Sequence, residues 1–159
     1  MTSDAGVRSF GMRVFFVFDG LLLFSLGYLI AFPDLQTTEP VGWILPVAAV
    51  AAMFGAAFHH SYAAQRKADG GVGVAAIGPA AAALLLIANV SGERLQGPYA
   101  IAVYVPTVVL AVHLVATAVA LLIAYFSGRR AAYQTPHVGA LLVFMTGATA
   151  FIVFSIFVF

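Results

Sequence analysis

Few side chains in this sequence could transfer a proton or hold a cofactor, and those few lie within or beside apolar stretches. They are Asp19, His59, His60, His113 and His137. The chain has no cysteine, which excludes thiolate metal ligands, iron–sulfur clusters and a cysteine nucleophile. A titratable group in an apolar environment is costly, and in a membrane segment it indicates a functional site. These five positions are therefore the candidates for chemistry.

Nothing in the sequence has the pattern of an enzyme active site. No nucleophile stands with a base, and the glycine-rich stretch ADGGVGV at residues 68–74 follows no strand, unlike a phosphate-binding loop. The net charge of +1 provides no basic surface for nucleic acid. We expect no catalytic activity of its own and no nucleic-acid partner.

The composition places these residues in a membrane protein. Hydrophobic residues make up 63% of the chain and charged residues 8%, whereas a soluble domain has about 25% charged residues. Apolar segments that approach or exceed the length of about 20 residues needed to cross a bilayer recur along the chain. We predict an all-α polytopic helix bundle, one transmembrane domain over residues 1–159, in the plasma membrane. Its five spans are expected at 12–32, 42–63, 72–91, 99–126 and 136–158.

Basic residues predict the orientation of the spans. Six of the seven Lys and Arg residues flank one set of span ends, and Arg94 alone lies in the other loops. Because cytoplasmic loops are enriched in Lys and Arg, we expect the N-terminus inside and, with five spans, the C-terminus outside.

Depth along the helices suggests a partner for Asp19. Asp19 follows Arg13 by six residues and His60 precedes Arg66 by six, so each lies roughly 9 Å from the inner boundary. We therefore predict a contact between Asp19 and His59 or His60. It would be either a structural clasp between two spans or a site for a proton relay, a quinone or another ligand.

Haem and metal sites are the weaker alternatives. His113 lies roughly 21 Å from the inner boundary, on the order of 12 Å deeper than His60. Haem b ligation by two histidines is thus permitted by residue type and disfavoured by depth. A zinc or copper site at His59, His60 and His137 with Asp19 is a further alternative, and we predict no metal site.

The helix faces indicate how the spans pack. The side of the fourth span that carries His113 is expected to face the bundle, and the valine-rich side to face lipid. Thr146 and Thr149 lie roughly 15–20 Å into the last span, where we expect them to hydrogen-bond His113. Small-residue pairs, which let helices approach closely, are predicted at Ala51 with Gly55 and at Gly78 with Ala82.

The last third of the chain resembles a family of small polytopic proteins of unknown function found alongside haem-copper oxidase genes. The resemblance runs from VVLAVHLVATAVALLIAYFSGRR to PHVGALLVFMTGATAFIVFSIF. His113, Arg129–Arg130, His137 and Thr146–Gly147 follow the order seen in that family, whereas its usual His-Arg near the first helices has no clear counterpart here. The resemblance implies a role in respiratory membranes.

Three functions follow as expectations. The first is a small subunit or accessory protein of a membrane complex, plausibly respiratory, that packs against a partner protein or its own copies in the bilayer. The second is a haem- or quinone-associated protein that handles electrons or protons at His59, His60 and His113. The third is a small oligomeric channel or transporter.

Overall fold

The computed structural model describes residues 17, 19–23, 25, 42–65, 71–92, 97–126 and 135–158. This part of the chain is almost entirely helical and contains no strand. The helices are α2 (Ile44–Gln65), α3 (Gly71–Ala75), α4 (Ile77–Gly92), α5 (Gly97–Phe126) and α6 (Thr135–Val158). The predicted all-α bundle is confirmed.

Four helices are long and apolar enough to cross a membrane, and they match four of the five predicted spans. They are Ile44–Gln65, Gly73–Gly92, Ala100–Phe126 and His137–Ile156. The second of these joins α3 to α4 across a turn at Ala76. Pro79 lies in the first turn of α4, where a missing N–H breaks no helical hydrogen bond. The first predicted span, 12–32, lies mostly outside the described residues.

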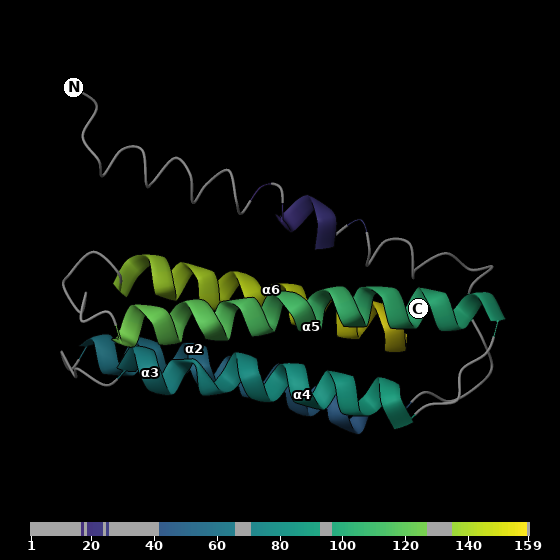
Figure 1. Ribbon diagram of the computed structural model, residues 1–159, viewed down its shortest axis with the longest axis horizontal. Coiled ribbons are helices and arrows are strands. Elements are labelled where there is room, and N and C mark those ends of the chain that lie inside the picture. Colours follow the sequence, from purple (N-terminus) through teal and green to yellow (C-terminus); the bar gives the residue numbers. More distant parts are fainter. Residues whose placement is uncertain are drawn as a thin grey trace.

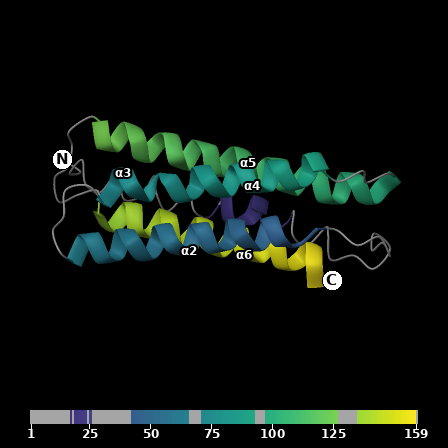
Figure 2. The same ribbon diagram turned by 90° about the horizontal axis from the view of Figure 1, so that it is seen from below.

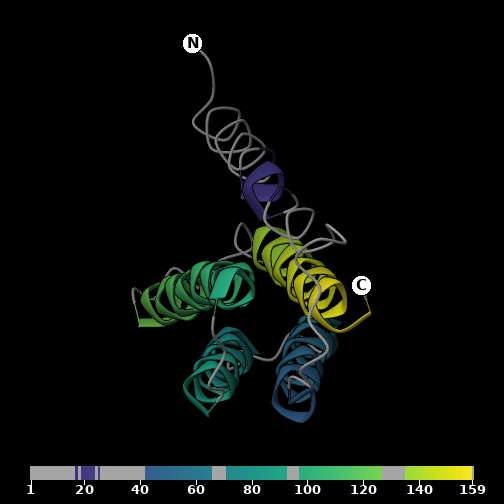
Figure 3. The ribbon, with the colours of Figure 1, turned by 90° about the vertical axis from the view of Figure 1, so that its right-hand side faces the viewer.

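The four long helices form an antiparallel ring (Figures 1 and 3). Helix α2 lies beside α4 and α6, α4 beside α5, and α5 beside α6. Helices adjacent in sequence are therefore neighbours in space, and α6 closes the ring against α2. The C-terminal ends of α2 and α5 lie at the same end of the ring as the start of α6 (Figure 2). All Lys and Arg residues lie outside the described residues, so the orientation stays a prediction.

Helices α2 and α4 approach each other closely at Gly78. A Cβ at this position would overlap the Cβ of Ala56 and would lie 2.8 Å from the carbonyl oxygen of Ala52. Gly78 and Ala82 are both buried, as the sequence predicts. Glycine is thus required at position 78 because the two backbones nearly touch.

The small-residue pair predicted on α2 is wrong. Ala51 and Gly55 are exposed, and a Cβ on Gly55 would meet nothing within 4 Å. The interface instead uses Ala52 and Ala56, one residue further along. Neighbouring residues point about 100° apart around a helix. Because Ala52 and Ala56 face α4, the predicted pair one position earlier faces the outside of the bundle.

The lipid-facing side of α5 lies where the sequence predicts. Its predicted lipid-facing residues are between 40% and 61% exposed; they are Val108, Val112, Val115, Val119 and Leu122. The core-facing line is made of Leu110, Leu114 and Leu121, none more than 2% exposed. His113 lies beside this line, on the side that faces α6.

A short N-terminal helical segment, residues 17, 19–23 and 25, lies outside the ring over α5 and α6 (Figure 3). Gly20 faces α6, where a Cβ would lie 3.5 Å from Cε2 of Phe144. Leu23 is 1% exposed. The segment therefore packs over α6 and α5, whereas the predicted contact of Asp19 with His59 or His60 would place it against α2.

Candidate functional site

The one ion pair between described side chains joins Asp19 of the N-terminal segment to His113 of α5. The Nε2 atom of His113 lies 2.7 Å from Oδ1 of Asp19. Asp19 is 7% exposed and the His113 side chain 24%. The pair lies near the middle of the 30-residue helix α5, so two titratable groups meet far from either end of the bundle.

The second ring nitrogen of His113 is also engaged. Its Nδ1 lies 2.7 Å from the carbonyl oxygen of Val109, one turn earlier in α5. A carbonyl oxygen only accepts, so Nδ1 must carry a hydrogen. When the pair is electrically neutral, one proton lies between Nε2 and Oδ1. It is bonded to Nε2 when the pair is imidazolium with carboxylate, and to Oδ1 when the pair is imidazole with carboxylic acid.

Asp19 keeps one oxygen without a hydrogen-bond partner. Its Oδ2 is fully buried and bonds to nothing in the described part of the chain. In both neutral forms of the pair the shared proton lies between Nε2 and Oδ1, so Oδ2 carries no hydrogen and is an acceptor. A buried acceptor without a donor is costly to the folded state.

The predicted contact of Asp19 with His59 or His60 is wrong. Asp19 bonds through Oδ1 to His113, and its Oδ2 bonds to neither histidine. Distance along the chain from the nearest basic residue does not give the depth of Asp19, because the spans do not all begin at one boundary. The contact with His113 shows instead that Asp19 lies at mid-depth, while His60 lies close to the end of α2.

The predicted hydrogen bonds from Thr146 and Thr149 to His113 are also wrong. Both threonines are buried as expected. However, Thr146 donates to the Leu142 carbonyl and Thr149 to the Met145 carbonyl, each at 2.7 Å. A threonine in a helix can satisfy its hydroxyl on its own preceding turn, so neither needs a partner on α5.

His60, rather than His59, faces the bundle. His60 is 3% exposed and packs on α6, where a Cβ on Gly139 would lie 3.7 Å from its Cδ2. His59 is half-buried, and its Nδ1 makes no hydrogen bond with the described residues. On the outer side, Phe58 and Tyr62 stack with ring centroids 6.5 Å apart.

The histidines do not fit a shared haem. Helices α2 and α5 occupy opposite corners of the ring (Figure 3), and both nitrogens of His113 already have partners. His137 is exposed at the start of α6. Among the described residues no group of three or more His, Cys, Asp or Glu side chains could hold a metal ion.

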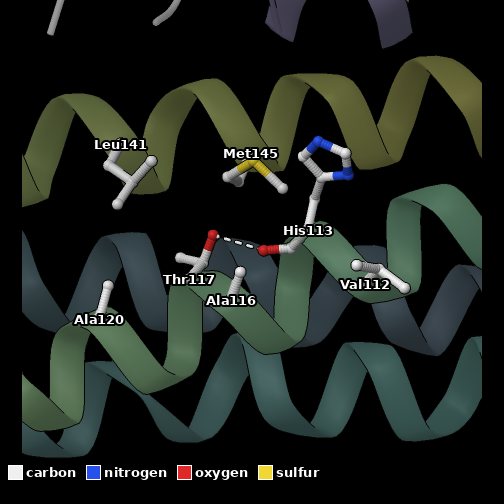
Figure 4. A pocket seen from close by; sticks show the side chains of 7 residues that line it. All are labelled: Val112, His113, Ala116, Thr117, Ala120, Leu141 and Met145. Atoms are coloured by element: carbon white, nitrogen blue, oxygen red, sulfur yellow. Dashed lines mark hydrogen bonds between the residues drawn. The ribbon is translucent and has the colours of Figure 1, made fainter. Parts of the chain in front are cut away.

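A cleft between α5 and α6 ends at His113 (Figure 4). Its volume is about 480 Å³, and it is lined by Val112, His113, Ala116, Thr117, Ala120, Leu141 and Met145. The small side chains of Ala116 and Ala120 leave the space open. The Thr117 hydroxyl donates to the His113 carbonyl at 2.8 Å, so its hydrogen is already used. We call this space the α5–α6 cleft.

None of the family models, curated proteins or solved structures compared with this chain matches it. The resemblance of the last third to small proteins associated with haem-copper oxidases therefore stays a prediction. The function must be argued from the site itself.

Asp19 and His113 are both among the residues predicted from the sequence, but their pairing is not, and neither are the roles of the Val109 carbonyl, Leu141 and Met145. The sequence contains one signal of the pairing: Asp19 is the lone acidic residue within the predicted spans, and His113 is the histidine furthest from any span end. A buried carboxylate at mid-depth requires such a partner.

Proposed function

We propose that this chain is a multi-pass integral membrane protein that binds and releases a proton at the Asp19–His113 pair. The proposal depends mainly on the two contacts of the His113 ring. Its Nδ1 bonds to the Val109 carbonyl, and its Nε2 contacts the buried carboxyl of Asp19. One proton on the Nε2–Oδ1 line keeps the pair neutral, and it can move between the two atoms without changing the net charge.

The position of the pair supports proton handling. Isolated charges within a bilayer are expensive, and titratable groups there commonly mark proton or ion pathways. The shared proton holds the net charge of the pair at zero in both forms. Oδ2 of Asp19 has no hydrogen-bond partner among the described residues, so it is a second atom of the pair that can bind or release a proton. His113 is partly exposed beside the α5–α6 cleft, so a proton can reach or leave the pair from that side as well.

Proton flux into liposomes that contain the purified protein tests the proposal. A pH-sensitive dye inside the vesicles reports the flux after a potassium diffusion potential is applied. We expect Asp19→Asn and His113→Gln to lower the flux by about 10²-fold or more, since each removes a proton-transfer group. Both substitutions retain a hydrogen-bonding side chain.

Thr149→Val is the matched control. Thr149 is 0% exposed and bonds only within α6, so this variant perturbs a buried polar position without a titratable group. Its flux should equal that of the unmodified protein. A flux no larger than that of empty vesicles, or an unchanged flux in Asp19→Asn, would contradict the proposal.

A second candidate is a subunit or accessory protein of a plasma-membrane complex, plausibly respiratory. It is favoured by outward-facing glycines on two helices: Gly55 and Gly147 are exposed, and a Cβ on either would meet nothing within 4 Å. Such positions let another helix approach closely.

Native mass spectrometry of mildly extracted membranes tests whether a partner protein is bound. Gly55→Leu should release the partner, whereas Val115→Leu should not. An oligomeric channel would appear as copies of this chain alone.

A further inference from the structure

We propose that a pocket between the start of α2 and the end of α4 binds the phosphate group of a phospholipid headgroup. The pocket has a volume of about 340 Å³ and is lined by residues 42–45 and by Ala88, Asn89 and Gly92. It lies at the opposite end of the ring from the start of α6 (Figure 2). Neither Asp19 nor His113 lines it, so this inference and the proposed function can fail separately.

The side chain of Asn89 is the polar group of this pocket. Asn89 is only 8% exposed, and its amide makes no hydrogen bond with the described residues. Neither atom of the amide is completely enclosed, so both keep accessible surface beside the pocket that Asn89 lines. A buried amide without a partner is costly, and its two N–H hydrogens are suited to an acceptor on a ligand.

The start of α2 adds backbone donors to the same pocket. The first N–H groups of a helix have no acceptor within the helix, and here those of Ile44 and Leu45 bond to no carbonyl of the described residues. Trp43 occupies the cap position, because its carbonyl accepts from the N–H of Val47 at 3.1 Å. The indole of Trp43 has no acceptor atom, so it cannot cap these donors as Ser or Asp would.

These donors favour a phosphate as the ligand. A phosphate presents several acceptor oxygens and a negative charge, which the N-terminal end of a helix attracts. Helix α4 ends at the same pocket, and the C-terminal end of a helix attracts a cation. A headgroup that carries both a phosphate and an ammonium, such as that of phosphatidylethanolamine, therefore matches the two helix ends better than a free phosphate dianion does.

The mouth of the pocket indicates that the phosphate belongs to a lipid. Trp43 is 61% and Ile44 is 67% exposed, so large apolar side chains stand beside the polar groups at the end of the bundle. Tryptophan is enriched at the level of the lipid headgroups. A phospholipid can place its phosphate against Asn89 and its acyl chains along the apolar outer surface of the helices.

Three probes distinguish a phospholipid site from an apolar groove and from a site for soluble phosphate. The full-length protein in detergent micelles is titrated with phosphatidylethanolamine, with diacylglycerol of the same acyl chains, and with inorganic phosphate. Native mass spectrometry gives the number of bound lipids, and the fluorescence of Trp43, the only tryptophan in the chain, reports binding at the pocket. We expect phosphatidylethanolamine to bind saturably and at least about tenfold more tightly than diacylglycerol, as hydrogen bonds to a charged group imply.

Variants locate the site. Asn89→Leu replaces an amide that has no partner in the protein with an apolar side chain, and it should lower the affinity for phosphatidylethanolamine about tenfold. Gly92→Phe should block the pocket, and a Cβ at this position meets nothing within 4 Å. Ser91→Ala is the matched control on the same turn of α4, because Ser91 does not line the pocket and donates to the Ile87 carbonyl. Circular dichroism checks that each variant folds, and Gly92→Phe decides if Asn89→Leu does not.

Each outcome decides the inference. Tighter binding of phosphatidylethanolamine that is lost in the pocket variants and kept in Ser91→Ala supports it. Equal binding of diacylglycerol would show an apolar groove and would overturn it. Displacement of the lipid by inorganic phosphate would show a site for soluble phosphate and would overturn the lipid as the ligand. Affinity unchanged in a folded Asn89→Leu variant would overturn it as well.

Discussion

At the scale of single residues, the decisive fact is how the two nitrogens of His113 are used. One bonds to the Val109 carbonyl and the other to Asp19. The bond to the Val109 carbonyl requires a hydrogen on Nδ1, because a carbonyl oxygen can only accept. The contact with Asp19 pairs a buried carboxyl, which would be costly alone, with a half-buried imidazole.

Nitrogen-15 NMR of histidine-labelled protein should show this asymmetry. We expect Nδ1 of His113 to carry a hydrogen, because the Val109 carbonyl can only accept. His137, which is exposed, serves as the comparison and should show no such preference for Nδ1. A His113 ring with a bare Nδ1 would contradict the assignment.

A double-mutant cycle should detect the pair as an energetic coupling. Asp19→Leu and His113→Leu each leave one buried polar group without its partner, so each should lower the free energy of unfolding by about 1–3 kcal/mol. The double substitution should cost less than the sum by about 0.5–3 kcal/mol. Unfolding in mixed detergent–SDS micelles, followed by circular dichroism, gives these values.

The same cycle between Asp19 and His60 is the control. His60 packs on Gly139 of α6, and Asp19 bonds to His113 on α5, so their effects should add within about 0.5 kcal/mol. Coupling of Asp19 to His60 in place of His113 would restore the sequence-based pairing and refute the observed one.

At the scale of the helices, packing density differs from one side of the ring to the other. Helices α2 and α4 nearly touch at Gly78. Helices α5 and α6 leave a cleft of about 480 Å³, and the N-terminal segment lies over this looser side. The ring thus has a close contact between α2 and α4 and an open cleft between α5 and α6.

Two glycine substitutions should report this difference. Gly78→Ala places a Cβ against Ala56 and the Ala52 carbonyl, and overpacking of this kind lowers the free energy of unfolding by about 1–3 kcal/mol. Gly55→Ala meets nothing within 4 Å and should raise it by about 0.5–1 kcal/mol, because alanine is the better helix former. Thermal unfolding in detergent compares the two, and equal effects would argue against the close contact of α2 with α4.

At the scale of the whole molecule, the ring is an up-and-down bundle whose apolar outer surface suits a bilayer. The ends of α2 and α5 that precede the basic loops lie at the same end of the ring (Figure 2). This arrangement agrees with the spacing of the basic residues along the sequence, although those residues lie outside the described part of the chain.

Reporter fusions test the orientation. A reporter after Phe159 should be outside, and one near Gly128 inside, because six of the seven basic residues are expected on the cytoplasmic side. Alkaline phosphatase and green fluorescent protein fusions give opposite signals on the two sides. The same side for both positions would show that α6 does not cross the membrane.

The sequence by itself determined the class of protein, the four long helices, the lipid-facing side of α5 and the close packing at Gly78. Each of these depends on composition or on spacing along one helix, which the sequence contains directly. The tertiary structure alone decided that Asp19 meets His113, that His60 lies against Gly139, and that α2 packs through Ala52 and Ala56. These depend on how helices are shifted and rotated against one another. A rotation of one residue, or a shift of a few turns, changes every partner while leaving each helix's own pattern intact.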